Sequence, residues 1–429
     1  MGLLGIPSYI SLFAAGLALF LSVDKAFLVL VVCAPLTTIA VFNLSGTSVL
    51  IYHLVWLVVA VKFLLKLRGE SERLNKLFVP FLAFTLCSIS FSLFSAGTVV
   101  VNVDNVYSTV KPSFQQFTQW IYLFVAVSTT IMAEYLLRTG SLDVQRLYRA
   151  LDVGLVIVLA AAFLQLILPA DVVTSLFRNS VHATYLGSGA RISSTFQEPS
   201  MLSLYLIPMT CIHLVRILRK PNVFSIVVVV LSLVVCVLNN SSAAFLSLIG
   251  SVLFILVAQC RLFGGGKISH VQILSVLGFL AVLGAVGLTG VFGDSIAHMA
   301  DKMMGEGVSG VERGDSIELM WSVFLAHPFV GIGWGTARCA TFFCWLAELG
   351  IIGASFAYVP VLIILKRLWA NLHGGFAIMA YLVSAFLILI AVSSEVYYLS
   401  LWIVLGLAMY ETDLGAPRAS GRRRLSNAA

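Results

Sequence analysis

The stretch ARISSTFQEPSMLSLYLIPMTCI, residues 190–212, joins a polar cluster to an apolar run. The apolar part is typical of a transmembrane helix, because a helix needs roughly 20 apolar residues to cross the hydrocarbon core of a bilayer. Similar runs fill most of the 429 residues, of which 60% are hydrophobic and only 10% charged. This composition excludes an ordinary soluble domain and predicts an all-α, polytopic membrane helix bundle.

The hydropathy pattern predicts about 13 spans, in the range of about 12 to 14, within a single integral membrane domain covering residues 1–429. The expected spans are 5–22, 26–42, 49–66, 77–97, 119–137, 149–169, 199–215, 223–239, 242–259, 271–292, 344–365, 375–393 and 396–411. The first apolar run has no preceding basic segment of the kind found in secretory signals, so we expect it to be retained as a span. Residues 412–429 form a C-terminal tail.

The basic residues predict the orientation of the bundle. With the N-terminus outside, 20 of the 26 Lys and Arg residues lie on the cytoplasmic side, as the positive-inside rule requires. The six that remain outside are Lys111, Arg178, Arg191, Lys302, Arg313 and Arg338. The net charge of +7 is therefore interpreted as a topology signal, with the tail in the cytoplasm and no nucleic-acid partner.

Three outer segments are long enough to carry function: residues 98–118, 170–198 and 293–343. The cytoplasmic loops are short and contain no Gly-rich phosphate loop, which disfavours an ATP-driven machine. The seven cysteines show no spacing typical of a metal site, so neither a metal nor a cofactor is predicted. The sequence thus places the activity at the outer face.

The longest outer segment contains an amphipathic helix. Between Arg313 and His327 the apolar residues recur at spacings of three and four, which is typical of a helix with one buried face. These residues are Ile317, Met320, Trp321, Phe324 and Leu325. Arg313 is expected just ahead of the helix or in its first turn, and the helix is expected to end at His327–Pro328, because proline disfavours helical geometry in the residue before it.

The following GIGWG sequence has glycines at 331, 333 and 335, which allow the backbone to approach either a ligand or a neighbouring helix closely.

Arg191 and Arg313 lie in the two longest outer loops. A single arginine at such a place is often a headgroup anchor. Two guanidinium groups also match phosphate oxygens with paired hydrogen bonds. At a membrane surface that phosphate would belong to a lipid phosphate or diphosphate.

The order of Arg313, Trp321, His327–Pro328, the three glycines and Glu348 resembles a pattern of the bacterial O-antigen ligase and polymerase superfamily. The segment from Arg191 to Ser200 is similar to one in Wzy-type polymerases of exopolysaccharide and capsule systems. Residues of about 190 to 360 carry the resemblance. Elsewhere the likeness is limited to hydropathy and topology.

The resemblance implies a GT-C-like, metal-independent glycosyltransferase of the bacterial inner membrane, with two functional periplasmic loops. The N-terminus is then periplasmic and the C-terminus cytoplasmic. Its substrates would be undecaprenyl-diphosphate-linked oligosaccharides, as donor and acceptor, held at the diphosphate by Arg191 and Arg313. A chain-length regulator is a further partner to consider. In this pattern the ligases of the superfamily have His-Asn at about the position where this chain has Cys339–Ala340. The resemblance therefore favours a polymerase over a ligase. It slightly favours exopolysaccharide as the product.

Glu198 is the first candidate for the general base that accepts a proton from the attacking hydroxyl. The alternative is that Glu198, which precedes Pro199, starts the next helix or pairs with an arginine. His327 and Glu348 are reserve candidates for the base, and the alternative for Glu348 is an ion pair with Arg313 or Arg338. The predicted substrate-binding residues are Ser193, Ser194, Gln197, Trp321, His327, Gly333, Trp334 and Glu348.

Aromatic residues near the outer face are either sugar-binding surfaces or members of the interfacial belt of a membrane protein. They are Tyr107, Phe114, Phe117, Trp120, Tyr185 and Trp334. The polar sets around 193–197 and 239–242 either hydrogen-bond a substrate or complete helix ends. A lipid-linked oligosaccharide flippase is the alternative from another functional class. It predicts mid-membrane charges and internal repeats, and the sequence shows neither.

Overall fold

The computed structural model describes residues 5–44, 47–67, 74–101, 107–181, 191–239, 241–262, 308–337, 341–391 and 398–412, and these ranges are mostly helical. Five of the described helices are long and apolar enough to cross a membrane: α5 (Phe114–Arg138), α6 (Val144–Ile167), α8 (Pro199–Arg219), α14 (Thr341–Ala370) and α15 (Leu372–Ala391). Shorter apolar helices accompany them: α1 (Ile6–Phe20), α4 (Val79–Ser88) with the 3-10 helix η2 (Ile89–Leu93), α9 (Val223–Asn239), α10 (Ser242–Leu262) and α16 (Leu399–Glu411). The chain is thus a multi-pass membrane protein, as predicted. The expected span 271–292 lies outside the described residues.

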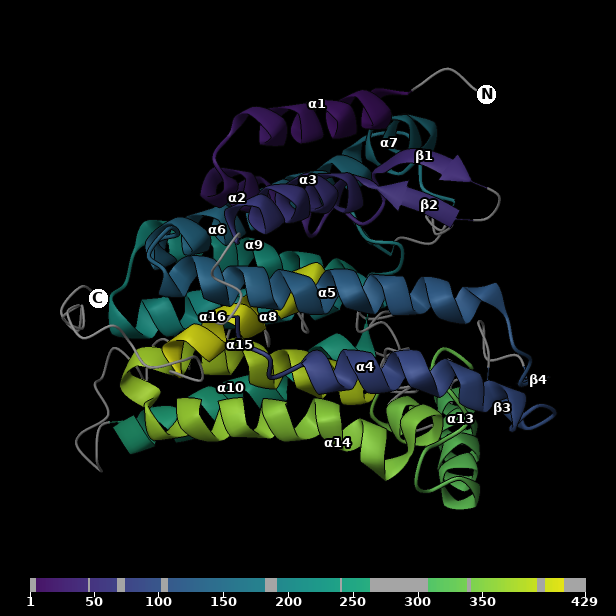
Figure 1. The fold of residues 1–429 in the computed structure, drawn as a ribbon. Helices are drawn as coiled ribbons and strands as arrows, with labels where there is room; N and C mark the ends of the chain where they lie inside the picture. The colour runs from purple at the N-terminus through teal and green to yellow at the C-terminus, as the bar shows by residue number, and fades with distance from the viewer. Residues whose placement is uncertain are drawn as a thin grey trace.

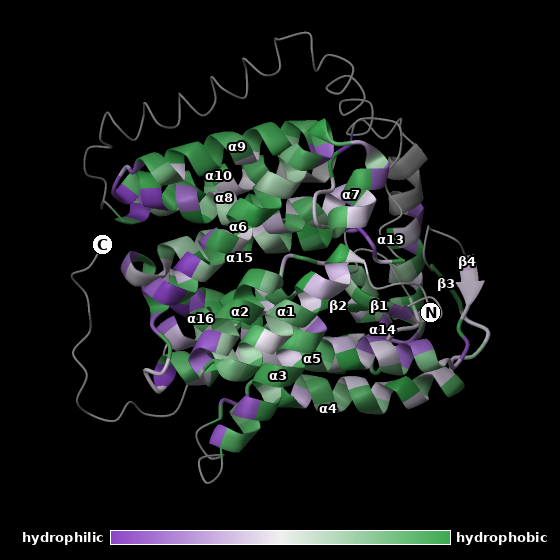
Figure 2. Cartoon of the chain, turned by 90° about the horizontal axis from the view of Figure 1, so that it is seen from above, coloured by the Kyte–Doolittle hydropathy of each residue, from purple (hydrophilic) through white to green (hydrophobic). Residues whose placement is uncertain are grey.

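The long helices run side by side through the bundle (Figure 1). Figure 2 shows hydrophobic residues along the middle of the helices and hydrophilic residues gathered toward their ends. The other helices are α2 (Val23–Cys33), α3 (Ile51–Lys66), α7 (Ala170–Phe177) and α13 (Val308–Ala326). Of these, α13 crosses one end of the bundle at a steep angle to the long helices (Figure 1).

Two small antiparallel hairpins lie at that same end. β1 (Ala40–Leu44) pairs with β2 (Thr47–Leu50), and β3 (Val99–Val101) pairs with β4 (Tyr107–Thr109). We call this the hairpin end, and it is the right-hand end in Figure 1. The sequence analysis predicted an all-α fold and missed both hairpins, which are too short to show an alternating pattern.

The predicted span 26–42 is wrong in its second half. Helix α2 ends at Cys33 and the chain then runs extended into β1. Pro35 interrupts the helical hydrogen bonding. The Thr38 amide donates to the Thr195 carbonyl at 3.0 Å, and its hydroxyl donates to the Phe177 carbonyl at 2.9 Å. The extended segment is therefore stabilised by loops more than 130 residues away, which no local pattern reveals.

The predicted span 77–97 also differs, because α4 ends at Ser88 and tightens into η2. Ser88 and Ser92 donate side-chain hydrogen bonds to carbonyls three residues earlier, at 2.8 and 2.7 Å. Such bonds from serine to the backbone compete with regular helix. Helix α5 in turn begins at Phe114, earlier than the predicted 119, and part of the expected outer loop 98–118 is therefore helical.

Helix α8 lies at the centre of the bundle. Every residue from Met201 to His213 is buried, and the helix packs on α9, α10 and α15. A helix that is buried all round has no lipid-facing side. Its first turn, at the hairpin end, is therefore held from all directions.

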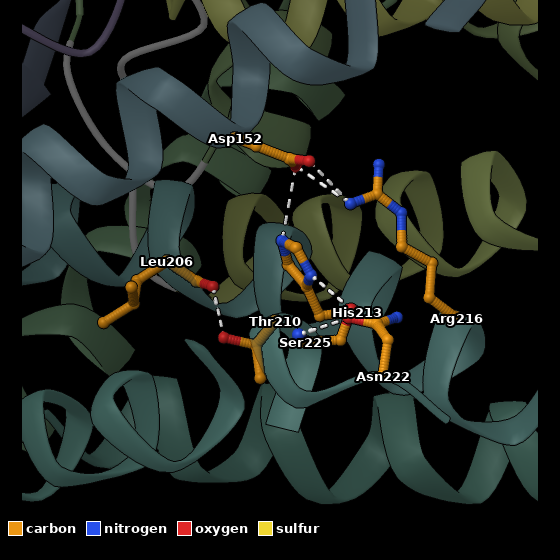
Figure 3. A network of polar contacts seen from close by, with 7 residues as sticks. All are labelled: Asp152, Leu206, Thr210, His213, Arg216, Asn222 and Ser225. Carbon is orange, nitrogen blue, oxygen red and sulfur yellow. Dashed lines mark hydrogen bonds and ion pairs between the residues drawn. The ribbon is translucent and has the colours of Figure 1, made fainter. Parts of the chain in front are cut away.

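A polar network fixes the other end of α8 (Figure 3). Arg216 Nη1 donates to both carboxylate oxygens of Asp152 on α6, at 3.0 and 2.8 Å. His213 Nε2 lies 3.4 Å from Asp152 Oδ1, and its Nδ1 lies 3.2 Å from the Ser225 hydroxyl on α9. The network joins α6, α8 and α9, and it pairs the charge that Asp152 brings to α6.

Candidate active site at the hairpin end

The polar segment before α8 is a buried loop. Ser193, Ser194, Thr195 and Phe196 are all buried, although the segment was predicted as part of an outer loop. The Thr195 hydroxyl donates to the Pro35 carbonyl at 2.9 Å. The polar residues are needed here because a buried loop must form its hydrogen bonds with neighbouring parts of the protein and not with water.

Ser194 has a φ of 53°, which is an unfavourable conformation for a residue with a side chain. Gln165 on α6 holds it, since its Oε1 accepts from the amides of Ser194 at 2.7 Å and Ser193 at 3.2 Å. The Ser194 hydroxyl donates to the Val158 carbonyl at 2.7 Å. A single strained residue of this kind costs about 1–3 kcal/mol, so its surroundings must impose the conformation.

Arg178 supplies the largest part of that support. Its side chain is only 1% exposed, and Nη1 donates to the carbonyls of Ser194 and Phe196, both at 2.7 Å. Nη2 lies 3.4 Å from the Gln197 carbonyl. Burial lowers the pKa of Arg178 to about 10, so the guanidinium remains charged at neutral pH. A buried cation surrounded by carbonyl oxygens fixes the path of the loop.

The sequence analysis missed this role of Arg178. The residue was one of six outer basic residues, and its sequence neighbours do not distinguish a buried arginine from a headgroup anchor. One local signal was present: Arg178 directly follows α7, and a cation at a helix C-terminus is favoured by the helix dipole.

Arg191 begins the described part of the loop and is half-buried. Its Nε donates to the carbonyl of Asn239, the last residue of α9, at 3.2 Å. Asn239 in turn donates from Nδ2 to the Pro199 carbonyl at 2.7 Å. In this arrangement the amide of Asn239 joins two helix ends, which is the structural alternative left open for it.

Glu198 is the N-cap residue of α8, but its carboxylate accepts no capping hydrogen bond from a backbone amide of that helix. The side chain is exposed, and Oε2 accepts from the Ser200 hydroxyl at 3.2 Å. Glu198 thus occupies the predicted helix start, while its carboxylate stays accessible at the lip of the buried loop. Gln197 beside it is half-buried.

The GIGWG loop requires its glycines for packing. Gly331, Gly333 and Gly335 have φ values of 72°, 106° and 74°. A Cβ on Gly331 would lie 2.3 Å from the Glu348 carbonyl carbon, and one on Gly333 would lie 2.8 Å from the Ser88 carbonyl oxygen. Close contact with neighbouring helices, the second of the two interpretations, accounts for these positions.

Helix α14 is interrupted opposite this loop. Gly350 has φ 61° and ψ −174°, and the freed backbone groups pair with the loop. The amides of Ile332 and Gly333 donate to the carbonyls of Ala347 and Glu348 at 3.0 and 2.9 Å. In return, the Ile351 amide donates to the Pro328 carbonyl at 2.8 Å. Irregular backbone at membrane depth is tolerated only where protein groups satisfy it in this way.

Glu348 and Trp334 are buried at this junction. Glu348 Oε1 accepts from the Ala337 amide at 2.9 Å, which closes the loop onto α14. Trp334 is 1% exposed and packs against Phe81 and Trp345. In this arrangement neither Trp334 nor the buried Gly333 presents a surface on which a sugar could lie.

Helix α13 ends at Ala326, immediately before His327–Pro328, as predicted. It begins at Val308, so Arg313 lies inside the helix and not at its start, where it was expected. The side chain of Arg313 is outside the described part of the chain. The buried face consists of Ser316, Met320 and Val323, whereas Trp321 is 43% exposed and His327 half-buried.

The hairpin end therefore brings together three of the predicted elements: the loop 191–198, helix α13 and the GIGWG loop (Figure 1). Arg191 lies in the loop that precedes α8, and Arg313 lies in α13, so the two arginines belong to different elements at this end. Within the described ranges, no group of three or more His, Cys, Asp or Glu residues could hold a metal ion. Cys339 and Ala340, on which the expectation of a polymerase and not a ligase rests, fall outside those ranges.

Residues 227–349 match the family model of O-antigen ligase. The match confirms the resemblance to the O-antigen ligase and polymerase superfamily. It includes α13, the GIGWG loop and Glu348, and it begins after the loop that contains Arg191. No curated protein matches the chain.

Proposed function

We propose that this membrane protein, related to the O-antigen ligases and polymerases, polymerises lipid-diphosphate-linked oligosaccharides at the hairpin end, on the periplasmic side of the inner membrane. The observation that carries the proposal is the family match over 227–349, which includes α13 with Arg313 and supports an enzyme of this superfamily. The choice of polymerase over ligase rests on Cys339–Ala340 in the sequence. The loop of Arg191 lies at the same end of the bundle as α13 (Figure 1). A diphosphate held between them would have a cation on each side.

The reaction transfers the growing glycan from its lipid diphosphate to an incoming lipid-linked repeat unit. An acceptor hydroxyl oxygen attacks the anomeric carbon of the donor, and the bond from that carbon to the diphosphate oxygen breaks. The hydroxyl proton passes to the Glu198 carboxylate, which is exposed beside the loop. Negative charge grows on the leaving diphosphate, so the arginines act most strongly in the transition state.

The buried loop supports this assignment for Arg191. Electrostatic catalysis depends on donors that are already oriented before the reaction. Arg191 meets this requirement, because its Nε donates a hydrogen bond to the carbonyl at the end of α9. The loop residues that follow it are hydrogen-bonded to Arg178 and Gln165. Loss of one such donor reduces the rate by on the order of 10²- to 10³-fold.

The test replaces Arg191 and Arg313 singly with Ala and with Lys in a strain that lacks its own copy of the protein. Glycan length is read on gels, and membrane insertion is checked by immunoblot. Lys111→Ala is the matched control, because it removes an exposed positive charge from the same predicted outer side. We expect single-repeat glycan in both Ala variants and partial polymer in the Lys variants. Full-length polymer in both Ala variants would refute the diphosphate clamp.

Glu198→Gln tests the base separately. The amide keeps an acceptor for the Ser200 hydroxyl but loses the carboxylate that takes the proton. Asp171→Asn, on the exposed side of α7, controls for the loss of a negative charge. Polymer of normal length from Glu198→Gln would remove Glu198 as the base and leave only its place at the start of α8.

Ligation is the second candidate function, because the matching family model is described as O-antigen ligase. A ligase would transfer finished polymer to another acceptor, so its loss leaves long polymer on the carrier lipid. A polymerase leaves single repeats. The length of the lipid-linked glycan in the Arg313→Ala strain therefore separates the two. Four further parts of the proposal rest on the resemblance alone. They are undecaprenyl diphosphate as the carrier lipid, exopolysaccharide as the product, a reaction without a metal ion, and a chain-length regulator as a partner.

A further inference from the structure

A groove lies at the hairpin end, away from the loop 191–198. It runs between η2 and the first turn of α5 and has a volume of about 530 Å³. This size falls within the range of roughly 300–1,000 Å³ typical of small-molecule sites. Its walls combine aromatic rings, from Phe114 and Phe117, with hydroxyl and amide groups, from Ser90, Ser92, Ser113 and Gln116.

Gln116 is the informative residue in this groove. Its side chain is 1% exposed, and Oε1 accepts from the Ser113 amide at 3.1 Å and lies 3.4 Å from the Ser92 hydroxyl, whose hydrogen goes to the Ile89 carbonyl. A backbone amide only donates, so this contact fixes which end of the Gln116 amide is the oxygen. Nε2, at the other end, is buried and has no hydrogen-bond partner among the described residues. An unsatisfied buried donor costs about 1–3 kcal/mol, so an acceptor from a ligand would relieve it.

The length of α5 places this groove outside the hydrocarbon. The helix has 25 residues. At a rise of about 1.5 Å per residue it spans roughly 37 Å, against a hydrocarbon core of about 30 Å. Counted from Arg138 at its far end, about 20 residues suffice to cross, which leaves the turn with Phe114, Gln116 and Phe117 in the headgroup region or beyond. A polar ligand can reach it there.

The aromatic rings are arranged as a surface. The ring centroids of Phe114 and Phe117 are 6.0 Å apart, and Phe117 stacks on Trp120 at 5.9 Å. Trp120 is fixed by a hydrogen bond from Nε1 to the Leu82 carbonyl at 3.1 Å. Phe114 is 79% exposed. Rings that present apolar area beside hydroxyl and amide groups match a sugar, which has apolar C–H faces and a rim of oxygens.

The groove also adjoins the proposed site. A Cβ on Gly335 would lie 3.1 Å from the Gln116 Cα, so the GIGWG loop rests directly on this turn of α5. That loop continues from α13, which carries Arg313. A ligand in the groove is therefore connected to the proposed site through one rigid loop.

We propose that the groove between η2 and α5 is a carbohydrate subsite, in which Gln116 Nε2 donates to a sugar oxygen and Phe114 with Phe117 supports the sugar rings. It binds a part of the glycan that is distant from the diphosphate. The subsite rests on the proposed function for the class of its ligand, and it is independent of the arginine clamp.

The test measures binding of the repeat-unit oligosaccharide, freed of lipid and phosphate by mild acid, to the full-length protein in detergent. Ligand-observed NMR gives the affinity. Gln116→Glu keeps an acceptor for the Ser113 amide and replaces the donating NH₂ group with a second carboxylate oxygen, which also adds a negative charge. Phe114→Ala removes a ring, and Phe94→Ala, which removes an 87% exposed ring outside the groove, is its matched control. Melting temperature and elution profile confirm that each variant is folded.

We expect Gln116→Glu and Phe114→Ala each to weaken oligosaccharide binding by about tenfold, the effect of one lost hydrogen bond or ring contact. Phe94→Ala and Arg191→Ala should retain wild-type affinity for this phosphate-free probe. Wild-type protein that does not bind the probe, or unchanged affinity in Gln116→Glu, would overturn the subsite. An effect of Phe114→Ala alone would identify a lipid-facing surface and also overturn it. If the arginine clamp is wrong, Arg191→Ala and Arg313→Ala make full-length polymer, whereas Gln116→Glu and Phe114→Ala still weaken the binding measured here.

Discussion

Replacement of Arg178 by Ala should uncouple the loop 191–198 from the bundle. The substitution removes the donor for the buried carbonyls of Ser194 and Phe196, each bonded at 2.7 Å. Each buried carbonyl left without a donor typically costs about 1–3 kcal/mol, so the loss of both contacts should cost about 2–6 kcal/mol. This is a large part of the total stability of a folded protein, which is about 5–15 kcal/mol. The strained conformation of Ser194 depends on the same contact, so the loop should relax as well.

The assay is the denaturation midpoint of the purified protein in detergent, together with glycan length in cells. Arg146→Ala is the matched control, because Arg146 is exposed on α6 and its loss should change stability by no more than about 0.5 kcal/mol. Arg178→Lys should recover part of the loss, since an ammonium keeps the charge but lacks the planar fork that reaches two carbonyls. If Arg178→Ala and Arg146→Ala unfold at the same midpoint, the buried arginine does not hold the loop.

Two further predictions concern α14. Gly350→Ala should prevent accumulation of folded protein, because φ at this position is 61° and the new Cβ would lie 2.3 Å from the Phe329 carbonyl carbon. Gly16→Ala is the control, because nothing lies within 4 Å of a Cβ there, and this variant should accumulate normally in the same immunoblot. Glu348→Gln should keep near wild-type stability and polymer length, because an amide oxygen still accepts from the Ala337 amide. Glu348→Ala should lower the free energy of unfolding by about 1–3 kcal/mol, which a denaturation curve measures. Loss of polymer in a stable Glu348→Gln variant would instead revive Glu348 as a proton acceptor.

The membrane bundle was predictable from the sequence because a span needs only a long apolar run. α5, α6, α8, α14 and α15 follow from this rule. The rule fails where the backbone is satisfied by distant partners. The extended segment after α2 depends on Thr195, and the break at Gly350 depends on the loop that begins at Pro328. Local hydropathy contains no information about such pairings.

The candidate site shows the same division. The end of α13 at His327–Pro328 follows from the local effect of proline, and the helix start at Glu198–Pro199 follows from the preference of proline for a first turn. The roles of Arg178 and Gln165 do not follow from any motif, because each acts on a loop at least 16 residues away. The packing role of the glycines was one of two alternatives, and only the neighbours of each missing Cβ separate them.

Two irregular segments at the hairpin end are each held by one buried polar side chain, the guanidinium of Arg178 and the carboxyl of Glu348. The loop 191–198 directs its carbonyls inward, and the buried cation Arg178 collects them. The loop after Pro328 directs amides inward, and the buried carboxyl of Glu348 accepts from Ala337, with Thr336 and Gly335 also contributing. Each of these two side chains thus supplies hydrogen bonds that a helix or sheet would otherwise provide. Because both loops are fixed from inside, the exposed Glu198 and the half-buried Arg191 are carried on a constrained backbone. A site that must orient two large lipid-linked substrates requires such a platform, since misplacement by about 1 Å is enough to reduce a rate by about 10².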